Sequence, residues 1–122
     1  MTKILIVEDD LSIQRLYRLK LELEGFEVSL ADNGRLGLIA AKEYSPDLIL
    51  LDLNMPVMGG EEMLIQLRAL PWGGGIRVII LTNMSKNEAP STLRFFNVDR
   101  YVVKAHHTPK QLVEIVHEVI GS

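Results

Sequence analysis

Four short apolar runs set the strongest limit on how this chain can fold. They are rich in isoleucine, valine and leucine, and they cover Ile4–Val7, Leu48–Leu51, Val78–Leu81 and Tyr101–Val103. Each run is too short for a helix of ordinary length, and an unbroken apolar run of this kind is typical of a parallel strand buried on both faces. A fifth segment, Glu27–Ala31, is more polar and alternates, which predicts a strand at the edge of the same sheet.

Helical patterns separate these predicted strands. The predicted helices cover Ile13–Leu23, Leu36–Tyr44, Glu61–Leu70, Lys86–Phe96 and Pro109–Ile120. In the first helix the apolar positions that recur near helical spacing are Ile13, Leu16, Leu19, Leu21 and Leu23, and Asp10 or Ser12 can cap its start. The fourth helix is the weakest pattern because Pro90 lies inside it. The order predicts an α/β fold with a five-stranded parallel sheet and helices on both faces.

Composition and charge fit one domain that covers residues 1–122. Hydrophobic residues make up 48% of the chain, which is enough for a core at this length. The formal net charge of −3, without a cluster of lysine and arginine, argues against a nucleic-acid-binding surface. The chain has no cysteine, which excludes disulfides and thiolate metal sites and fits a reducing cytoplasm. No apolar run approaches the length of a membrane span, so no membrane partner is expected.

Polar residues stand where each apolar run ends. Glu8 and Asp9 follow the first run, Asp52 the second, Thr82 the third and Lys104 the fourth. The carboxyl ends of parallel strands meet at one edge of a sheet, and sites form there near a switch in strand order. We therefore expect several carboxylates, one hydroxyl and one ammonium group to lie close together.

The chemistry of this predicted cluster favours a divalent cation and phosphoryl transfer. Neighbouring carboxylates resist joint ionisation, and a hard cation such as Mg²⁺ relieves their repulsion. A carboxylate held beside the cation can act as a nucleophile and form an aspartyl phosphate. Lys104 would add positive charge around the phosphoryl oxygens, and Thr82 could donate a hydrogen bond to one of them.

The sequence resembles the receiver domain of two-component response regulators over essentially its whole length. The resemblance rests on the run from Ile4 to Asp10, on Leu50 to Pro56 with Gly60, on Leu81-Thr82 and on the run from Tyr101 to Lys104. It implies the CheY-like, flavodoxin-like (βα)5 fold. It also implies a signalling switch that takes a phosphoryl group from a histidine kinase or a phosphotransfer protein, with no enzymatic activity beyond its own phosphotransfer and dephosphorylation.

The resemblance also assigns a role to individual residues. Asp52 is implied as the phosphoacceptor, Asp9 as a direct Mg²⁺ ligand, Glu8 as an assisting ligand through water, and the main-chain carbonyl of Asn54 as a further ligand. Thr82 corresponds to the switch hydroxyl and Lys104 to the lysine that contacts the phosphoryl group. Tyr101 corresponds to the aromatic residue that changes burial on activation. The implied output face comprises the fourth helix, fifth strand and fifth helix, and a phosphorylation-dependent homodimer through this face is compatible with the family.

Several positions depart from the family pattern. Ala105 follows Lys104 where a proline in a cis bond is usual, so we expect either an altered trans loop or a strained cis bond. Asn83 stands where a small residue is usual and is expected to screen Asp52 in part. Gly59 replaces a frequent aspartate, and Asn97-Val98 stands where Gly-Ala is usual.

Two other functions remain open from the sequence. One is a phosphorylation-independent interaction module with the receiver fold, which Asn83 and Ala105 would favour. The other is a small Mg²⁺-dependent phosphohydrolase, because Asp52-Leu53-Asn54 is faintly similar to the Asp-x-Asp motif of haloacid-dehalogenase-type phosphatases. That motif lacks its second aspartate here and lies on the third predicted strand rather than the first.

Overall fold

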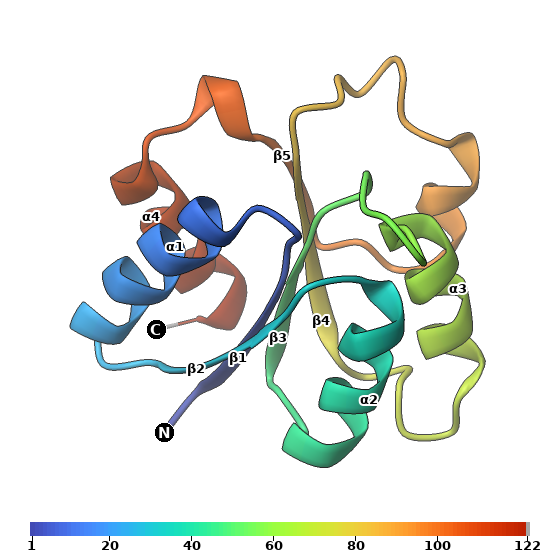
Figure 1. The fold of residues 1–122 in the computed structure, drawn as a ribbon, viewed down its shortest axis with the longest axis horizontal. Helices are drawn as coiled ribbons and strands as arrows, with labels where there is room; N and C mark the ends of the chain where they lie inside the picture. Colours follow the sequence, from blue (N-terminus) through green and yellow to red (C-terminus); the bar gives the residue numbers. More distant parts are fainter. Residues whose placement is uncertain (122) are drawn as a thin grey trace.

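A five-stranded parallel sheet forms the centre of the computed structural model, which describes residues 1–121 (Figure 1). The strand order is β2-β1-β3-β4-β5, so β2 is an edge strand, as its alternating sequence predicts. The strands are β1 (Lys3–Val7), β2 (Glu27–Ala31), β3 (Leu48–Leu51), β4 (Arg77–Thr82) and β5 (Arg100–Val103). The order reverses between β1 and β3, which places the ends of these two strands beside the switch point.

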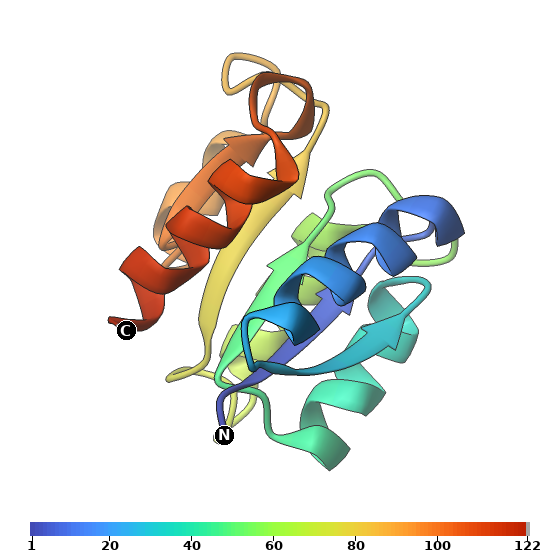
Figure 2. The same ribbon diagram turned by 90° about the vertical axis from the view of Figure 1, so that its left-hand side faces the viewer.

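Helices cover both faces of the sheet. They are α1 (Leu11–Leu23), α2 (Gly34–Tyr44), α3 (Gly60–Ala69) and α4 (Pro109–Ile120), with the short 3-10 helices η1 (Ser91–Phe95) and η2 (Lys104–His106). Helices α1 and α4 lie side by side on one face, as Figure 2 shows, and α2 and α3 cover the other. The predicted α/β architecture is therefore confirmed.

The alternation of side chains along β1 explains its unbroken apolar run. Ile4 and Ile6 belong to the core under α1 and α4, whereas Leu5 and Val7 belong to the core under α2 and α3. These four side chains are at most 1% exposed. A strand covered on both faces needs apolar residues at every position.

The prediction of a helix over Lys86–Phe96 is wrong. The structure has only the 3-10 helix η1 (Ser91–Phe95) within Lys86–Phe96, and Pro90 immediately precedes it. Proline lacks the N–H for an α-helical bond and disfavours helical geometry in the residue before it. Asn97 then takes a positive φ of 55°, which turns the chain towards β5. The predicted output face therefore has a short 3-10 helix of five residues where the family pattern implies a longer helix.

The buried face of α1 does not follow its leucines. The range Leu11–Leu23 includes the predicted helix, and Asp10 caps it by accepting hydrogen bonds from the N–H groups of Ser12 and Ile13. Its buried residues are Gln14, Tyr17 and Leu21. Leu16, Leu19 and Leu23 are exposed, so α1 carries apolar residues on its outer side as well.

Candidate functional site

Glu8 and Asp52 directly continue β1 and β3 at the carboxyl edge of the sheet. The Glu8 N–H donates to the carbonyl of Ala31 at 3.0 Å, and the Asp52 N–H donates to the carbonyl of Val7 at 3.1 Å. Glu8 is 4% exposed and Asp52 is 7% exposed, so both carboxylates lie inside the protein surface. Hydrogen bonds between neighbouring strands therefore fix the main-chain positions of Glu8 and Asp52.

Three carboxylates meet at this edge. One oxygen from each of Glu8, Asp9 and Asp52 lies within 4.8 Å of the others, and Asp9 is the exposed member. Carboxylate oxygens are the ligands that a hard divalent cation such as Mg²⁺ prefers, and the cation would relieve their repulsion. Asn54 lies two residues after Asp52, and its N–H donates to Asp52 Oδ1 at 3.3 Å. The donor set therefore fits Mg²⁺.

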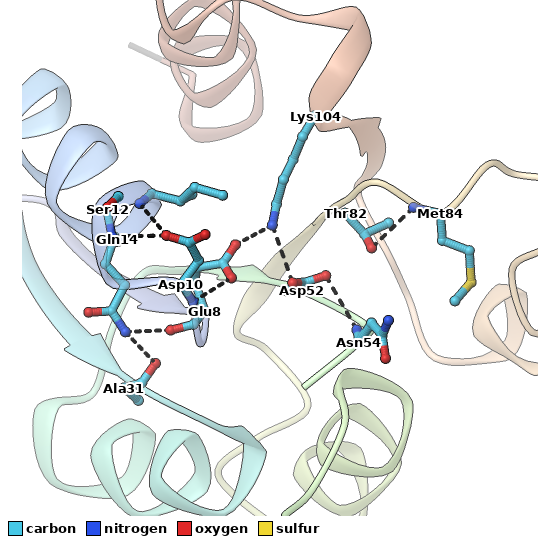
Figure 3. A network of polar contacts seen from close by, with 11 residues as sticks. Glu8, Asp10, Ser12, Gln14, Ala31, Asp52, Asn54, Thr82, Met84 and Lys104 are labelled. Carbon is cyan, nitrogen blue, oxygen red and sulfur yellow. Dashed lines mark hydrogen bonds and ion pairs between the residues drawn. The ribbon is translucent and has the colours of Figure 1, made fainter. Parts of the chain in front are cut away.

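Lys104 lies against two of these carboxylates. Its Nζ donates to Glu8 Oε1 and, at 3.2 Å, to Asp52 Oδ2 (Figure 3). Burial raises the pKa of the Glu8 carboxyl above its ordinary value, although the bond from Lys104 opposes this change. Burial lowers the pKa of Lys104, but the hydrogen bond to Glu8 and the charge of Asp52 outweigh it, and the net pKa is raised. The ammonium group is thus held charged beside Asp52.

An open cavity of about 350 Å³ lies over Asp52. It is lined by Asp52, Asn54, Thr82, Asn83, Met84, Glu88 and Lys104. Thr82 is 1% exposed, and its Oγ1 accepts a bond from the Met84 N–H at 3.4 Å. The cavity therefore presents a carboxylate, a hydroxyl and an ammonium group to one small space.

Tyr101 connects β5 to the loop after β4. Its hydroxyl donates to the carbonyl of Met84 at 2.7 Å, and the carbonyl of Ser85 lies 3.3 Å away. Burial raises the pKa of this hydroxyl, with smaller contributions from Glu88 and Asp52. Since Met84 N–H also contacts Thr82, Tyr101 and Thr82 share one loop residue.

The departures from the family pattern leave the site assembled. The peptide bonds of residues 1–121 are all trans, so Lys104–Ala105 follows the altered-loop alternative. Lys104 nevertheless reaches Asp52. Asn83 is exposed on the rim of the cavity.

Gly60, the first residue of α3, lies directly against the main chain of Asp52. A Cβ atom placed on Gly60 would lie 2.2 Å from the carbonyl oxygen of Asp52, which is far inside contact distance. The Gly60 N–H also donates to the carbonyl of Leu53 at 3.0 Å. The missing side chain therefore lets α3 pack directly beneath the Asp52 segment.

Sequence reasoning missed Gln14, a buried polar residue beside the acidic loop. Its Nε2 donates to the carbonyl of Glu8 and to Asp32 Oδ1 at 2.8 Å. Gln14 lies three and seven residues before Tyr17 and Leu21, which share its buried face. That spacing could have marked it as a polar group on the core side of α1.

Comparison with known families gives a match over most of the chain. Residues 4–117 match the model of the response regulator receiver domain. The chain is 35% identical over 118 residues to the cell cycle response regulator CtrA of Brucella ovis, a match that covers 97% of this chain and 50% of that protein. The chain spans about half the length of the curated relatives it matches.

Solved structures share the fold over nearly the whole length. Chemotaxis response regulator CheY4 of Vibrio cholerae superimposes with a TM-score of 0.89 and 29% identity, covering 98% of both chains. A CheY-like receiver domain protein from Methanospirillum hungatei gives a TM-score of 0.87 and 30% identity, covering 99% of this chain and 94% of that one. Within residues 1–121, no helix has the length and apolar character that a membrane crossing requires.

Proposed function

This chain belongs to the family of response regulator receiver domains, and from that premise we propose that it is a signalling switch phosphorylated on Asp52 with the help of Mg²⁺. The main observation is that the buried Asp52 pairs with Lys104 at 3.2 Å, and that both line one cavity. Two further carboxylates lie beside Asp52. An isolated buried carboxylate would be costly, whereas this one faces groups that fit an incoming phosphoryl group. We propose that the receiver domain covers residues 1–122.

The proposed metal ligands are Asp9, Asp52 and the carbonyl of Asn54, with Glu8 assisting through water. These groups come from the ends of β1 and β3, where three carboxylate oxygens already lie together. When bound, Mg²⁺ would supply positive charge at the phosphoryl oxygens and reduce the repulsion between them and the carboxylates.

The proposed transfer makes one bond and breaks one bond. A carboxylate oxygen of Asp52 attacks phosphorus, and the bond from phosphorus to the donor's histidine nitrogen breaks. That nitrogen keeps the electron pair, and the result is an acyl phosphate on Asp52. Lys104 then offers its ammonium group to a phosphoryl oxygen in place of the Asp52 carboxylate, and Thr82 offers its hydroxyl to another. The same site would return the phosphate to water, without turnover on a separate substrate.

The proposed response runs from Thr82 to Tyr101. Movement of the Thr82 hydroxyl towards the phosphoryl group would also shift Met84, because the Met84 N–H donates to Thr82. This shift would reach Tyr101, whose hydroxyl donates to the Met84 carbonyl. The Tyr101 side chain is half-buried and could move further inward as that loop shifts. A single charged group would thereby bias two loop conformations.

The proposed partners follow from the family. The donor would be a cytoplasmic histidine kinase or phosphotransfer protein, since ATP supplies the phosphoryl group there. The output partner, whether a protein, another domain or a second copy of this chain, would contact the face of η1, β5 and α4. One solved relative, from Staphylococcus aureus, is described as a DNA-binding response regulator of the LuxR family. For the present domain we propose no direct contact with nucleic acid or membrane.

The test is intact-mass measurement after incubation with acetyl phosphate and Mg²⁺. We expect one phosphoryl adduct on the wild type, and none on Asp52→Asn or in the presence of a chelator. Circular dichroism of Asp52→Asn would establish that the variant is folded. An adduct retained by folded Asp52→Asn would contradict the assignment of the phosphoacceptor.

Two other outcomes would point to the alternative functions. A folded wild type that forms no adduct and binds neither Mg²⁺ nor beryllofluoride would favour the phosphorylation-independent module. Multiple turnover on a panel of phosphate esters would favour the phosphohydrolase.

A further inference from the structure

Gln14 is a buried amide whose nitrogen lies among three oxygen atoms. It is 3% exposed, on the face of α1 that packs against the sheet. Its Nε2 donates to the carbonyl of Glu8, and the carbonyl of Ala31 lies 3.5 Å away (Figure 3). The same nitrogen donates to Asp32 Oδ1 at 2.8 Å. A buried amide is stable when such partners are present, and these three oxygens fix which end of the amide faces the strand ends.

The Glu8 carbonyl belongs to the planar peptide unit that joins Glu8 to Asp9. A hydrogen bond to this oxygen therefore restrains the orientation of the whole unit, including the start of Asp9. The N–H of Glu8 is held from the other side by the carbonyl of Ala31 at 3.0 Å. Together, the two bonds tie the turn after β1 to α1 and to the end of β2.

We propose that Gln14 is a positioning residue that sets the direction of the two carboxylates after β1 for Mg²⁺ binding, an inference that rests on the proposed function. The Glu8 side chain has two further partners, Lys104 and the Asp10 N–H at 3.0 Å. The Asp9 side chain is exposed, so its direction depends more strongly on the main chain that Gln14 restrains.

Asp32 holds Gln14 in this role. Its carboxylate lies in the loop after β2 and accepts from the Gln14 amide. The contact passes from α1 to the β2–α2 loop and joins segments 18 residues apart in the sequence. Loss of this acceptor would leave the Gln14 amide free to turn away from Glu8.

The main test compares Mg²⁺ affinity in Gln14→Met and Leu21→Ala by calorimetric titration. Methionine keeps the volume of glutamine and removes its donor. Leu21 is a fully buried residue on the same face of α1, so its truncation destabilises the fold without touching the acidic loop. We expect the Mg²⁺ dissociation constant to rise about tenfold in Gln14→Met, as for the removal of other partners of metal ligands, and to stay unchanged in folded Leu21→Ala.

A second pair of variants keeps the test decisive if Gln14→Met folds poorly. Asp32→Asn keeps an acceptor oxygen for Gln14, whereas Asp32→Ala removes it. Both variants lack the negative charge of the Asp32 carboxylate, so the pair differs only in the acceptor and in side-chain size. We expect weaker Mg²⁺ binding in Asp32→Ala than in Asp32→Asn. Equal affinities in this pair, or wild-type affinity in folded Gln14→Met, would overturn the positioning role. A wild type that binds no Mg²⁺ would instead overturn the proposed function and this inference with it.

Discussion

The two sides of the site are built differently. On the β1–β2 side, hydrogen bonds to main-chain groups hold the acidic loop, because Glu8 and Gln14 both contact the end of β2. On the β4–β5 side, the segment between the strands contains the short helix η1, and Tyr101 is joined to it through loop carbonyls. Local stability in proteins follows such differences in anchoring. We therefore expect the acidic side to be ordered before a ligand binds and the β4–β5 side to change conformation when it binds.

Arg68 joins the end of the segment between β4 and β5 to α3 and to the loop before β4. From α3 its guanidinium group donates to five carbonyls, those of Gly73, Gly74, Ile76, Phe96 and Asn97. Arg68→Ala would leave several of these carbonyls without a partner, so we expect a loss of about 3 kcal/mol in the free energy of unfolding. Urea denaturation measures this loss. Arg18→Ala is the control, because its exposed pair with Glu22 contributes little.

Arg68→Lys tests whether the planar set of donors, rather than the positive charge alone, is needed. One ammonium group cannot reproduce the planar set of donors, so we expect lysine to restore only a small part of the loss. Full stability in Arg68→Ala would show that the β4–β5 side is held by other contacts.

Lys104 joins the two sides, because it directly follows β5 and contacts Glu8 after β1. It also contacts Asp52 after the central strand β3. Lys104→Met removes the hydrogen bonds to the two carboxylates, so we expect a loss of about 2 kcal/mol in the free energy of unfolding without metal. The ammonium group also competes with a cation for the same oxygens. We therefore expect Mg²⁺ to raise the melting temperature of Lys104→Met more than that of the wild type.

Differential scanning fluorimetry with and without Mg²⁺ measures this effect. The exposed Lys110→Met is the matched control and should behave like the wild type. An equal Mg²⁺ shift in wild type and Lys104→Met would argue against the competition.

Replacing Tyr101 is expected to change the free energy of unfolding by a smaller amount, and this change depends on pH. Tyr101→Phe removes the bond to Met84 and should cost about 1 kcal/mol near neutral pH. The pKa of the Tyr101 hydroxyl is raised above 10.0 in the folded protein, so folding favours its protonated form. This contribution is fully present below pH 10 and is lost as the pH rises through the folded-state pKa.

Urea denaturation of both proteins across alkaline pH measures the difference. We expect the gap between wild type and Tyr101→Phe to be constant up to about pH 10, the ordinary tyrosine value, and to shrink above it. A gap that widens with pH would mean that the ionised hydroxyl is the form favoured in the folded state.

The sequence predicts the parallel sheet and the convergence of its acidic ends, because both follow from local patterns. Buried strands must be apolar at every position, and the residues after them must meet at one edge. The α1 leucines show the limit of this reasoning. Their spacing predicts a helix correctly, but Leu16, Leu19 and Leu23 are exposed while Gln14 is buried. The exposed leucines give the same apolar signal as the buried Tyr17 and Leu21, so apolar spacing alone does not single out the face that meets the sheet.

The sequence is less informative on the β4–β5 side. Pro90 marks the weakness of the predicted fourth helix, but the sequence does not show that a 3-10 turn replaces it. In the same way, the trans bond before Ala105 and the contact of Lys104 with Glu8 depend on tertiary packing.

Hydrogen exchange with beryllofluoride and Mg²⁺ reports which side of the site responds to a phosphoryl mimic on Asp52. We predict that amide exchange changes most from Thr82 to Val103, with little change in β2 and the C-terminal part of α1. Asp52→Asn should show no such change. A response of equal size across the whole domain, or an unaltered exchange pattern in the wild type when the mimic is bound, would contradict the account.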